Sequence, residues 1–325
     1  MGEEGSVISN GILVLLMILF LGMVGGYFLK KNKVQFLQEA GLATLLGILF
    51  GGILEYLGEG SELQPVTRLN VEFFLLFLLP PIIFESGYNM DKDAFFANFG
   101  PICSFAFLGT FISALIVSSL MFIINYATSL TDYKLTLAES FAFGSLISAT
   151  DPVSVLAIMK DLRADRTLYN LVFGESIFND AVTISLYRAI IEIENSDSAE
   201  TSYLASAGKF LVIFSGSFLV GAGVALIVSY LLRKLSDMQQ RVDLEAAAVI
   251  FGPWVSYLLS EALSMSGIVS ILFCGIFMAR YTHPNLSETA QGMVGKAYSV
   301  IGHCAETLVF IFLGMGLFSF SLPYE

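Results

Sequence analysis

Long apolar blocks, separated by short charged patches, dominate this chain of 325 residues. The hydrocarbon core of a bilayer is about 30 Å thick, so a helix of about 20 apolar residues can cross it. Helices can lie in this layer because they satisfy their backbone hydrogen bonds internally. The chain is 56% hydrophobic and 14% charged, which leaves too few charges for the surface of a soluble domain. The pattern predicts an all-α polytopic membrane protein.

The distribution of cations between the apolar blocks predicts the orientation. With the N-terminus outside, twelve of the 16 Lys and Arg residues lie on the cytoplasmic side, as the positive-inside rule requires. The opposite loops are acidic. We expect about ten transmembrane helices, at 9–29, 40–58, 70–87, 100–126, 137–159, 168–192, 209–232, 244–262, 266–281 and 297–321.

Several function classes are disfavoured by composition and motifs. A net charge of -12 without a basic face argues against a nucleic-acid partner. Cys103, Cys274 and Cys304 lie inside apolar blocks, at spacings that fit neither a disulfide framework nor a zinc site. The sequence contains no Walker loop and no dinucleotide fingerprint. We therefore expect no cofactor and no enzymatic activity.

Four carboxylates fall in the central parts of predicted spans: Asp151, Glu175, Asp180 and Glu306. An ionisable group at membrane depth costs at least ~2.5 kcal/mol, so each of them needs a partner, a water-filled cavity or a function. A second set of acids lies near span ends, where we expect the side chains to reach headgroups or water. These acids are Glu39, Glu55, Glu72, Glu85, Glu139, Glu245 and Glu261.

Asp151 precedes Pro152 in the middle of the fifth predicted span. Proline removes a backbone donor, and Ser148, Thr150 and Asp151 place side-chain oxygens beside the resulting break. Interrupted helices of this kind expose carbonyl groups at the midplane and form cation sites in secondary transporters. We therefore predict a discontinuous helix at Asp151-Pro152. The alternative is a structural proline kink.

The sixth predicted span carries Glu175, Asn179 and Asp180. Glu175 and Asn179 are four residues apart and share a helix face, whereas Asp180 is rotated by about 100° from Asn179. A desolvated carboxylate such as Asp180 can alternate between holding a proton and holding a monovalent cation, which couples the two fluxes without ATP. Asn179 would orient this site without adding charge. Alternatively, Asp180 is neutral or joins two helices through a salt bridge.

Four motifs occur in order along nearly the whole chain. They are Phe77-Leu78-Leu79-Pro80-Pro81-Ile82-Ile83-Phe84-Glu85-Ser86-Gly87-Tyr88, the 148–153 break, Phe173-Gly174-Glu175-Ser176 with Asn179-Asp180, and Glu306-Thr307 before Phe310-Ile311-Phe312-Leu313-Gly314. Together these motifs resemble those of the eukaryotic sodium/proton exchangers. The segments at 143–147 and 149–152 are more similar to the organellar branch than to the plasma-membrane branch.

The resemblance implies an inverted-repeat antiporter fold, in which a mobile core domain moves against a dimerisation domain. It implies that Asp180 binds the cation and is protonated in exchange, with Asn179 beside it. Asp151 and Thr150 would lie at the first broken helix, and an Asn-Asp pair would accompany electroneutral exchange. The implied parts are scaffold helices in 1–99, core transport helices in 100–192, linker and dimerisation helices in 193–296, and the start of the second core half in 297–325.

The family also has spans beyond the point that matches Glu325, so we expect the second repeat to be incomplete. The leading hypothesis is a homodimeric antiporter, surrounded by membrane lipids, that exchanges Na⁺ or K⁺ for H⁺. We expect an endomembrane such as the Golgi or endosome, or the plasma membrane. One alternative is a non-transporting subunit that dimerises with a full-length exchanger and regulates it. Another is an intramembrane protease that uses Ser145 with His303, or Asp151 with Asp180; His303 is otherwise expected to be packed or hydrogen-bonded.

Overall fold

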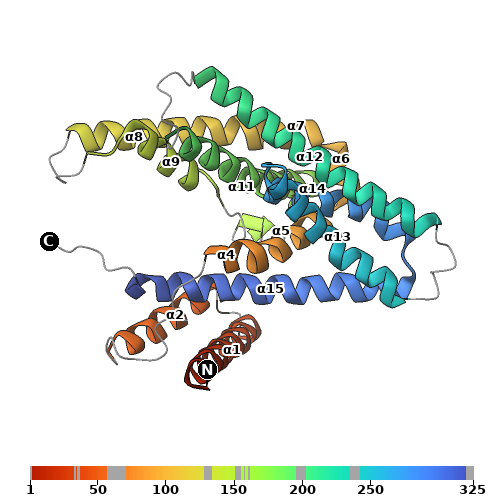
Figure 1. The fold of residues 1–325 in the computed structure, drawn as a ribbon, viewed down its shortest axis with the longest axis horizontal. Helices are drawn as coiled ribbons and strands as arrows, with labels where there is room; N and C mark the ends of the chain where they lie inside the picture. The colour runs from red at the N-terminus through yellow and green to blue at the C-terminus, as the bar shows by residue number, and fades with distance from the viewer. Residues whose placement is uncertain are drawn as a thin grey trace. The chain divides into compact units, whose positions relative to one another are not determined.

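The structure is a computed structural model. It describes residues 2–32, 34, 37–56, 71–127, 134–150, 155–156, 158–159, 162–194, 203–234 and 242–319, which form helices and turns and no strand (Figure 1). The all-α prediction is confirmed. Five helical segments in these ranges are long and apolar enough to cross a membrane: Asn10–Lys31, Phe99–Ala127, Gly208–Lys234, Val242–Ala262 and Glu288–Leu317. The count of ten spans remains a prediction.

The chain divides into two compact units, which are described separately. The first comprises residues 1–82 and 296–325, and the second comprises 83–295. The four functional segments expected from the sequence remain a prediction, because compactness does not test which helices move or dimerise.

In the first unit, glycines allow two helices to approach closely. The unit contains α1 (Gly2–Lys31), α2 (Glu39–Tyr56), α4 (Val71–Phe73), the π-helical stretch η1 (Phe74–Leu78), the start of α5 (Leu79–Tyr88) and most of α15 (Glu288–Ser319). A Cβ atom on Gly47 of α2 would lie 2.1 Å from the carbonyl oxygen of Ile311 on α15. Small residues at such crossings are typical of membrane helix pairs.

A carboxylate joins α1, α2 and α15 in this unit. Glu39 at the start of α2 lies 2.6 Å from Lys30 Nζ of α1, and its other oxygen lies 2.7 Å from His303 Nε2 of α15. The Glu39 side chain is 16% exposed, whereas the side chains of Lys30 and His303 are 73% and 37% exposed. His303 is thus a hydrogen-bonded histidine, as expected.

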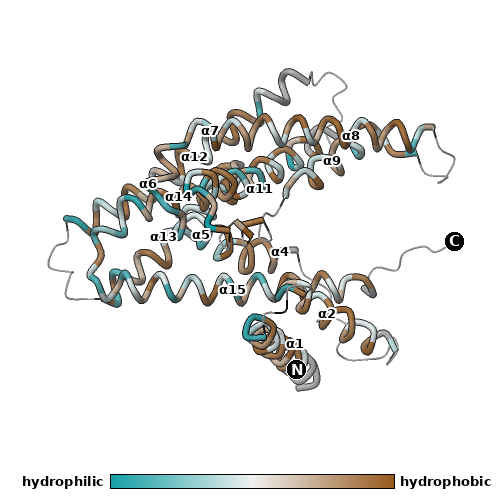
Figure 2. Tube along the Cα trace, turned by 180° about the vertical axis from the view of Figure 1, so that it is seen from behind, coloured by the Kyte–Doolittle hydropathy of each residue, from teal (hydrophilic) through white to brown (hydrophobic). Residues whose placement is uncertain are grey.

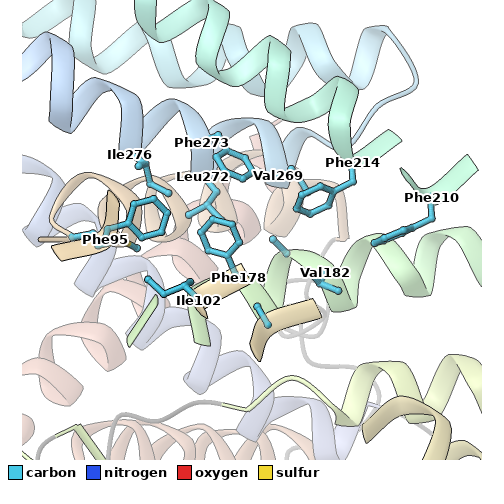
Figure 3. Close-up of a cluster of buried hydrophobic side chains, with 13 residues drawn as sticks. Phe95, Ile102, Phe178, Val182, Phe210, Phe214, Val269, Leu272, Phe273 and Ile276 are labelled. Carbon is cyan, nitrogen blue, oxygen red and sulfur yellow. The ribbon is translucent and has the colours of Figure 1, made fainter. Parts of the chain in front are cut away.

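The second unit contains the remaining helices and a core of aromatic rings. Phe178 of α11 packs edge-to-face on Phe273 of α14, with ring centroids 5.2 Å apart, and Phe95 and Phe214 extend the cluster (Figure 3). The unit contains α6 (Lys92–Ala97), α7 (Phe99–Ser104), η2 (Phe105–Gly109), α8 (Thr110–Ala127), α9 (Leu137–Ile147), α11 (Arg166–Glu194), α12 (Tyr203–Lys234), α13 (Val242–Ala262), α14 (Gly267–Phe277), η4 (Met278–Thr282) and η5 (His283–Asn285).

Large apolar side chains also lie on the outside of the helices. Figure 2 shows hydrophobic residues along much of α8. On that helix Ile112, Leu115, Ile116, Leu120 and Ile123 are each more than half exposed. Such a surface is unsuitable for water and suits the hydrocarbon interior of a bilayer.

Candidate cation site

In the fifth predicted span, α9 covers the first part, and the described residues 155–156 and 158–159 are helical again. A capping box begins α9, in which Glu139 N donates to Thr136 Oγ1 at 3.1 Å and Thr136 N donates to Glu139 Oε2 at 2.7 Å. The helix ends at Ile147, Ser148 caps it in a turn, and residues 149 and 150 are not helical. Asp151 and Pro152, where the interruption was predicted, lie outside the described residues. The non-helical segment before them leaves the backbone carbonyl of Thr150 available to other partners.

Helix α11 brings the other candidate residues to this segment. Phe178 is completely buried in the aromatic cluster (Figure 3), which fixes the rotation of the helix at that point. The adjacent residue Asn179 is only 1% exposed. Because successive residues are turned by about 100°, Asp180 lies on a different face, and its side chain is exposed.

Three side chains of α11 and Thr150 form a hydrogen-bonded network. Asn179 Nδ2 donates to Glu175 Oε1 at 3.1 Å and to Thr150 Oγ1 at 3.2 Å. Ser176 Oγ donates to the carbonyl oxygen of Thr150 at 3.2 Å. The structure therefore brings Thr150, Glu175 and Asn179 together, and the shared helix face predicted for Glu175 and Asn179 is confirmed.

The amide of Asn179 is held in one orientation and retains an unused acceptor. A carboxylate oxygen accepts hydrogen bonds, so the Nδ2 atom is the one that faces Glu175. The Oδ1 atom is buried and accepts no hydrogen bond from any residue that the structure describes. An unsatisfied buried acceptor costs about 1–3 kcal/mol, and a cation, a water or a protonated group can relieve this cost.

The oxygens gathered here have the chemistry of an alkali-cation site. Carbonyl, amide and carboxylate oxygens bind hard cations, and unwound backbone beside a helix is a common source of them in transporters. The described residues contain no group of three or more His, Cys, Asp or Glu side chains that could hold a metal ion. A site for a monovalent cargo ion rests on fewer charges, and Asp180 is the nearest carboxylate in sequence to Asn179.

The sequence analysis did not include Ser176 in the site, and it misjudged the environment of Glu245. Ser176 holds the Thr150 carbonyl, and its spacing of three residues from Asn179 could have indicated a shared face. Glu245 was expected to reach headgroups or water, which is wrong: it is 2% exposed, and its Oε2 atom accepts from Ser287 N at 2.9 Å and Ser287 Oγ at 2.7 Å. That contact joins residues 42 apart, so helical periodicity could not have revealed it.

Ser145 and His303, the serine pair of the protease hypothesis, contact other residues, and Asp151 of the aspartyl pair lies outside the described residues. Ser145 Oγ donates to the carbonyl oxygen of Ala142 at 2.8 Å, and His303 is paired with Glu39. Cys103, Cys274 and Cys304 are free thiols, of which Cys274 is buried, as expected for packing residues. Glu306, the fourth central carboxylate, is exposed on α15.

Comparison with known proteins identifies the family. The profile of the family described as "Sodium/hydrogen exchanger, transmembrane" matches residues 11–324. The chain belongs to the sodium/hydrogen exchanger family. It is 39% identical to sodium/hydrogen exchanger 5 of Arabidopsis thaliana over 308 residues, and 40% identical to sodium/hydrogen exchanger 8 of Gallus gallus over 319 residues.

These alignments cover most of the exchanger chain and about half of its relatives. They include 94% and 95% of this chain, but 59% of the Arabidopsis protein and 54% of the chicken protein. The fold is similar to that of the sodium proton antiporter MjNhaP1 from Methanocaldococcus jannaschii at pH 8. The TM-score is 0.72 at 18% identity, over 95% of this chain and 71% of that one. The chain thus has an antiporter fold and is a multi-pass membrane protein.

Proposed function

We propose that this exchanger chain exchanges Na⁺ for H⁺ across a membrane by competition of the two ions for Asp180. The observation that carries the proposal is the fixed, buried amide of Asn179, bonded to both Thr150 and Glu175 and directly followed by the exposed carboxylate of Asp180. Asp180 would supply the exchangeable charge, and the adjacent network of Asn179, Thr150 and Glu175 would supply further oxygens.

The exchange cycle follows from the charge of one carboxylate. Asp180 binds a proton on one side of the membrane and releases it on the other, where a cation takes its place. One proton therefore leaves for each monovalent cation that enters, and the exchange is electroneutral. Asn179 orients the site without adding charge, and Thr150 and Asp151 add oxygens to it. The same oxygens accept K⁺, which differs from Na⁺ in radius and dehydration cost.

The family assignment also supports a cellular setting. We place the protein in an endomembrane such as the Golgi or endosome, or in the plasma membrane, as a homodimer. The names of its relatives support exchange of Na⁺ and H⁺ in particular, and those relatives are longer than this chain. The test therefore uses this chain itself.

Proton flux in liposomes tests the proposal. The purified chain is reconstituted and Na⁺ or K⁺ pulses are applied while internal pH is recorded. Asp180→Asn removes the exchangeable charge, so cation-driven proton flux should disappear while expression and dimerisation stay near normal. Asp151→Asn should weaken flux less. Asp243→Asn is the matched control, since Asp243 is an exposed acid in the first turn of α13.

Each outcome separates the hypotheses. Flux that is lost in Asp180→Asn and kept in Asp243→Asn supports exchange centred on Asp180. Flux that persists in Asp180→Asn contradicts the assignment of the site. A folded parent chain without flux contradicts transport by this chain and favours the non-transporting subunit, for which co-reconstitution with a full-length exchanger measures regulation.

A further inference from the structure

The loop between α5 and α6 is held by two arginines from distant parts of the second unit. Arg166 at the start of α11 forms an ion pair with Asp91, in which Nε donates to Oδ2 at 3.1 Å. Arg280 of η4 forms an ion pair with Asp93. The hydrogen bond from Arg166 holds the pKa of Asp91 below its usual range. Asp91 is therefore ionised at neutral pH, and each aspartate forms an ion pair with its own arginine.

A cavity of about 250 Å³ lies behind this loop. It is smaller than the ~300–1,000 Å³ of sites for drug-sized ligands, so it suits a small group. Gly295 of α15 forms part of its wall, and a Cβ atom added there would meet nothing within 4 Å. Tyr88 also lines the cavity, is 6% exposed, and its hydroxyl has no hydrogen-bond partner among the described residues.

Lys92 also lines the cavity, and it has no carboxylate partner among the described residues. With Asp91 and Asp93 taken by arginines, Lys92 forms no ion pair within the described ranges, and its Nζ atom makes only a long contact of 3.4 Å to the carbonyl oxygen of Ala279. Its charge acts on the cavity, because burial and the nearby Lys92 lower the pKa of His283. The His283 ring lies against Tyr88, with centroids 5.9 Å apart.

We propose that this cavity binds a phosphate-type anion, held by the Lys92 ammonium, the Tyr88 hydroxyl and His283. A buried hydroxyl without a partner, a lysine without a carboxylate and an imidazole are the donors that such an anion requires. Asp91 and Asp93 also line the cavity, and their ion pairs with Arg166 and Arg280 offset their charges beside Lys92. The loop lies on the predicted cytoplasmic side, where both free phosphate and the anionic headgroups of the inner leaflet are present.

Thermal unfolding of the full chain tests the site without any need for transport. In one arm the chain in detergent receives inorganic phosphate or chloride at equal ionic strength and equal Na⁺ concentration. In the other arm it is placed in phosphatidylcholine nanodiscs with or without phosphatidic acid. Tyr88→Phe removes only the hydroxyl, Lys92→Gln removes the charge, and Gly295→Leu fills the cavity. Lys234→Gln is the control, since Lys234 is an exposed lysine on the same predicted side.

We expect the anion to raise the unfolding midpoint of the parent and of Lys234→Gln. In Tyr88→Phe and Lys92→Gln the apparent affinity should fall roughly tenfold or more, because a hydrogen bond to a charged group is lost. In Gly295→Leu the shift should be absent. A shift with free phosphate identifies a soluble ligand, and a shift with phosphatidic acid alone identifies a lipid headgroup. No shift in either arm, or equal affinity in Tyr88→Phe and the parent, overturns the proposal.

Discussion

Two adjacent residues of α11 have opposite environments, and this difference gives the candidate site its chemistry. Asn179 is buried, and its Nδ2 atom donates to Thr150 and Glu175, whereas Asp180 is exposed. A proton-exchanging carboxylate needs access to water, and an orienting amide needs a fixed position. A single helical step of about 100° places one side chain in each environment. The completely buried ring of Phe178 prevents the helix from rotating and exchanging these roles.

The hydrogen bond from Asn179 to Thr150 gives a prediction at this scale. Thr150→Val keeps the side-chain shape but removes the acceptor, so one Asn179 N–H is left without its partner. The site should bind Na⁺ several-fold more weakly, since such a loss costs about 1–3 kcal/mol. The thermal unfolding midpoint, measured at increasing Na⁺ concentrations, reports this affinity.

Thr150→Ser is the matched control, because it retains the hydroxyl. It should require nearly the parent concentration of Na⁺ for half-maximal stabilisation. If Thr150→Val matched the parent as well, the hydrogen bond would be structural, and the Thr150 side chain would have no part in the cation site.

At the scale of elements, close helix packing depends on particular glycines. On α12, a Cβ atom at Gly221 would lie 2.2 Å from the carbonyl oxygen of Ser270 on α14, whereas one at Gly223 would meet nothing within 4 Å. The α12–α14 crossing supports Phe273 and therefore the aromatic cluster around Phe178. Backbone atoms cannot move aside as a side chain can. The crossing therefore requires glycine at position 221, whereas position 223 can accept a larger residue.

These two positions form a matched pair for mutation. Gly221→Ala should lower the free energy of unfolding by about 1–3 kcal/mol through overpacking. Gly223→Ala adds the same methyl group two residues away in the same helix and should be neutral or stabilise by up to about 1 kcal/mol, because alanine favours the helix. Unfolding midpoints in detergent measure both. Equal destabilisation by the two variants would show that the crossing is looser than the structure indicates.

Periodicity and hydropathy predicted most of the elements, but long-range partners were not predictable. Apolar length located most of the long helices but not the short helix α6, and helical spacing correctly paired Glu175 with Asn179. By contrast, the hydrogen bond between Ser287 and Glu245 and the cavity lined by Tyr88 and Gly295 join residues far apart in the sequence. The π-helical stretch at Phe74–Leu78, just before Pro80-Pro81, was not predicted, because hydropathy does not distinguish one extra residue in a turn.

For the whole second unit, ion pairs mark the two ends of α11. Arg166 bonds to Asp91 at one end, and Arg188 Nη1 lies 2.9 Å from Glu261 Oε1 at the other. The two arginines are 22 residues apart on one helix, which corresponds to about 33 Å and matches a hydrocarbon thickness of about 30 Å. We infer that these pairs lie at the two membrane surfaces, with Arg166, Asp91 and the Arg280–Asp93 pair on the cytoplasmic side.

This topology predicts opposite accessibility for Thr167 and Ser264. Thr167 is exposed beside Arg166, and Ser264 is exposed in the turn after α13. In the topology predicted from the sequence, α11, α12 and α13 each cross the membrane, which places the two residues on opposite sides. In a variant without Cys103, Cys274 and Cys304, Ser264→Cys should react with an impermeant maleimide from outside intact cells. Thr167→Cys should react only in inverted vesicles. Labelling of both cysteines from the same face would contradict the side assigned to every loop of this unit, including the loop that carries Lys92.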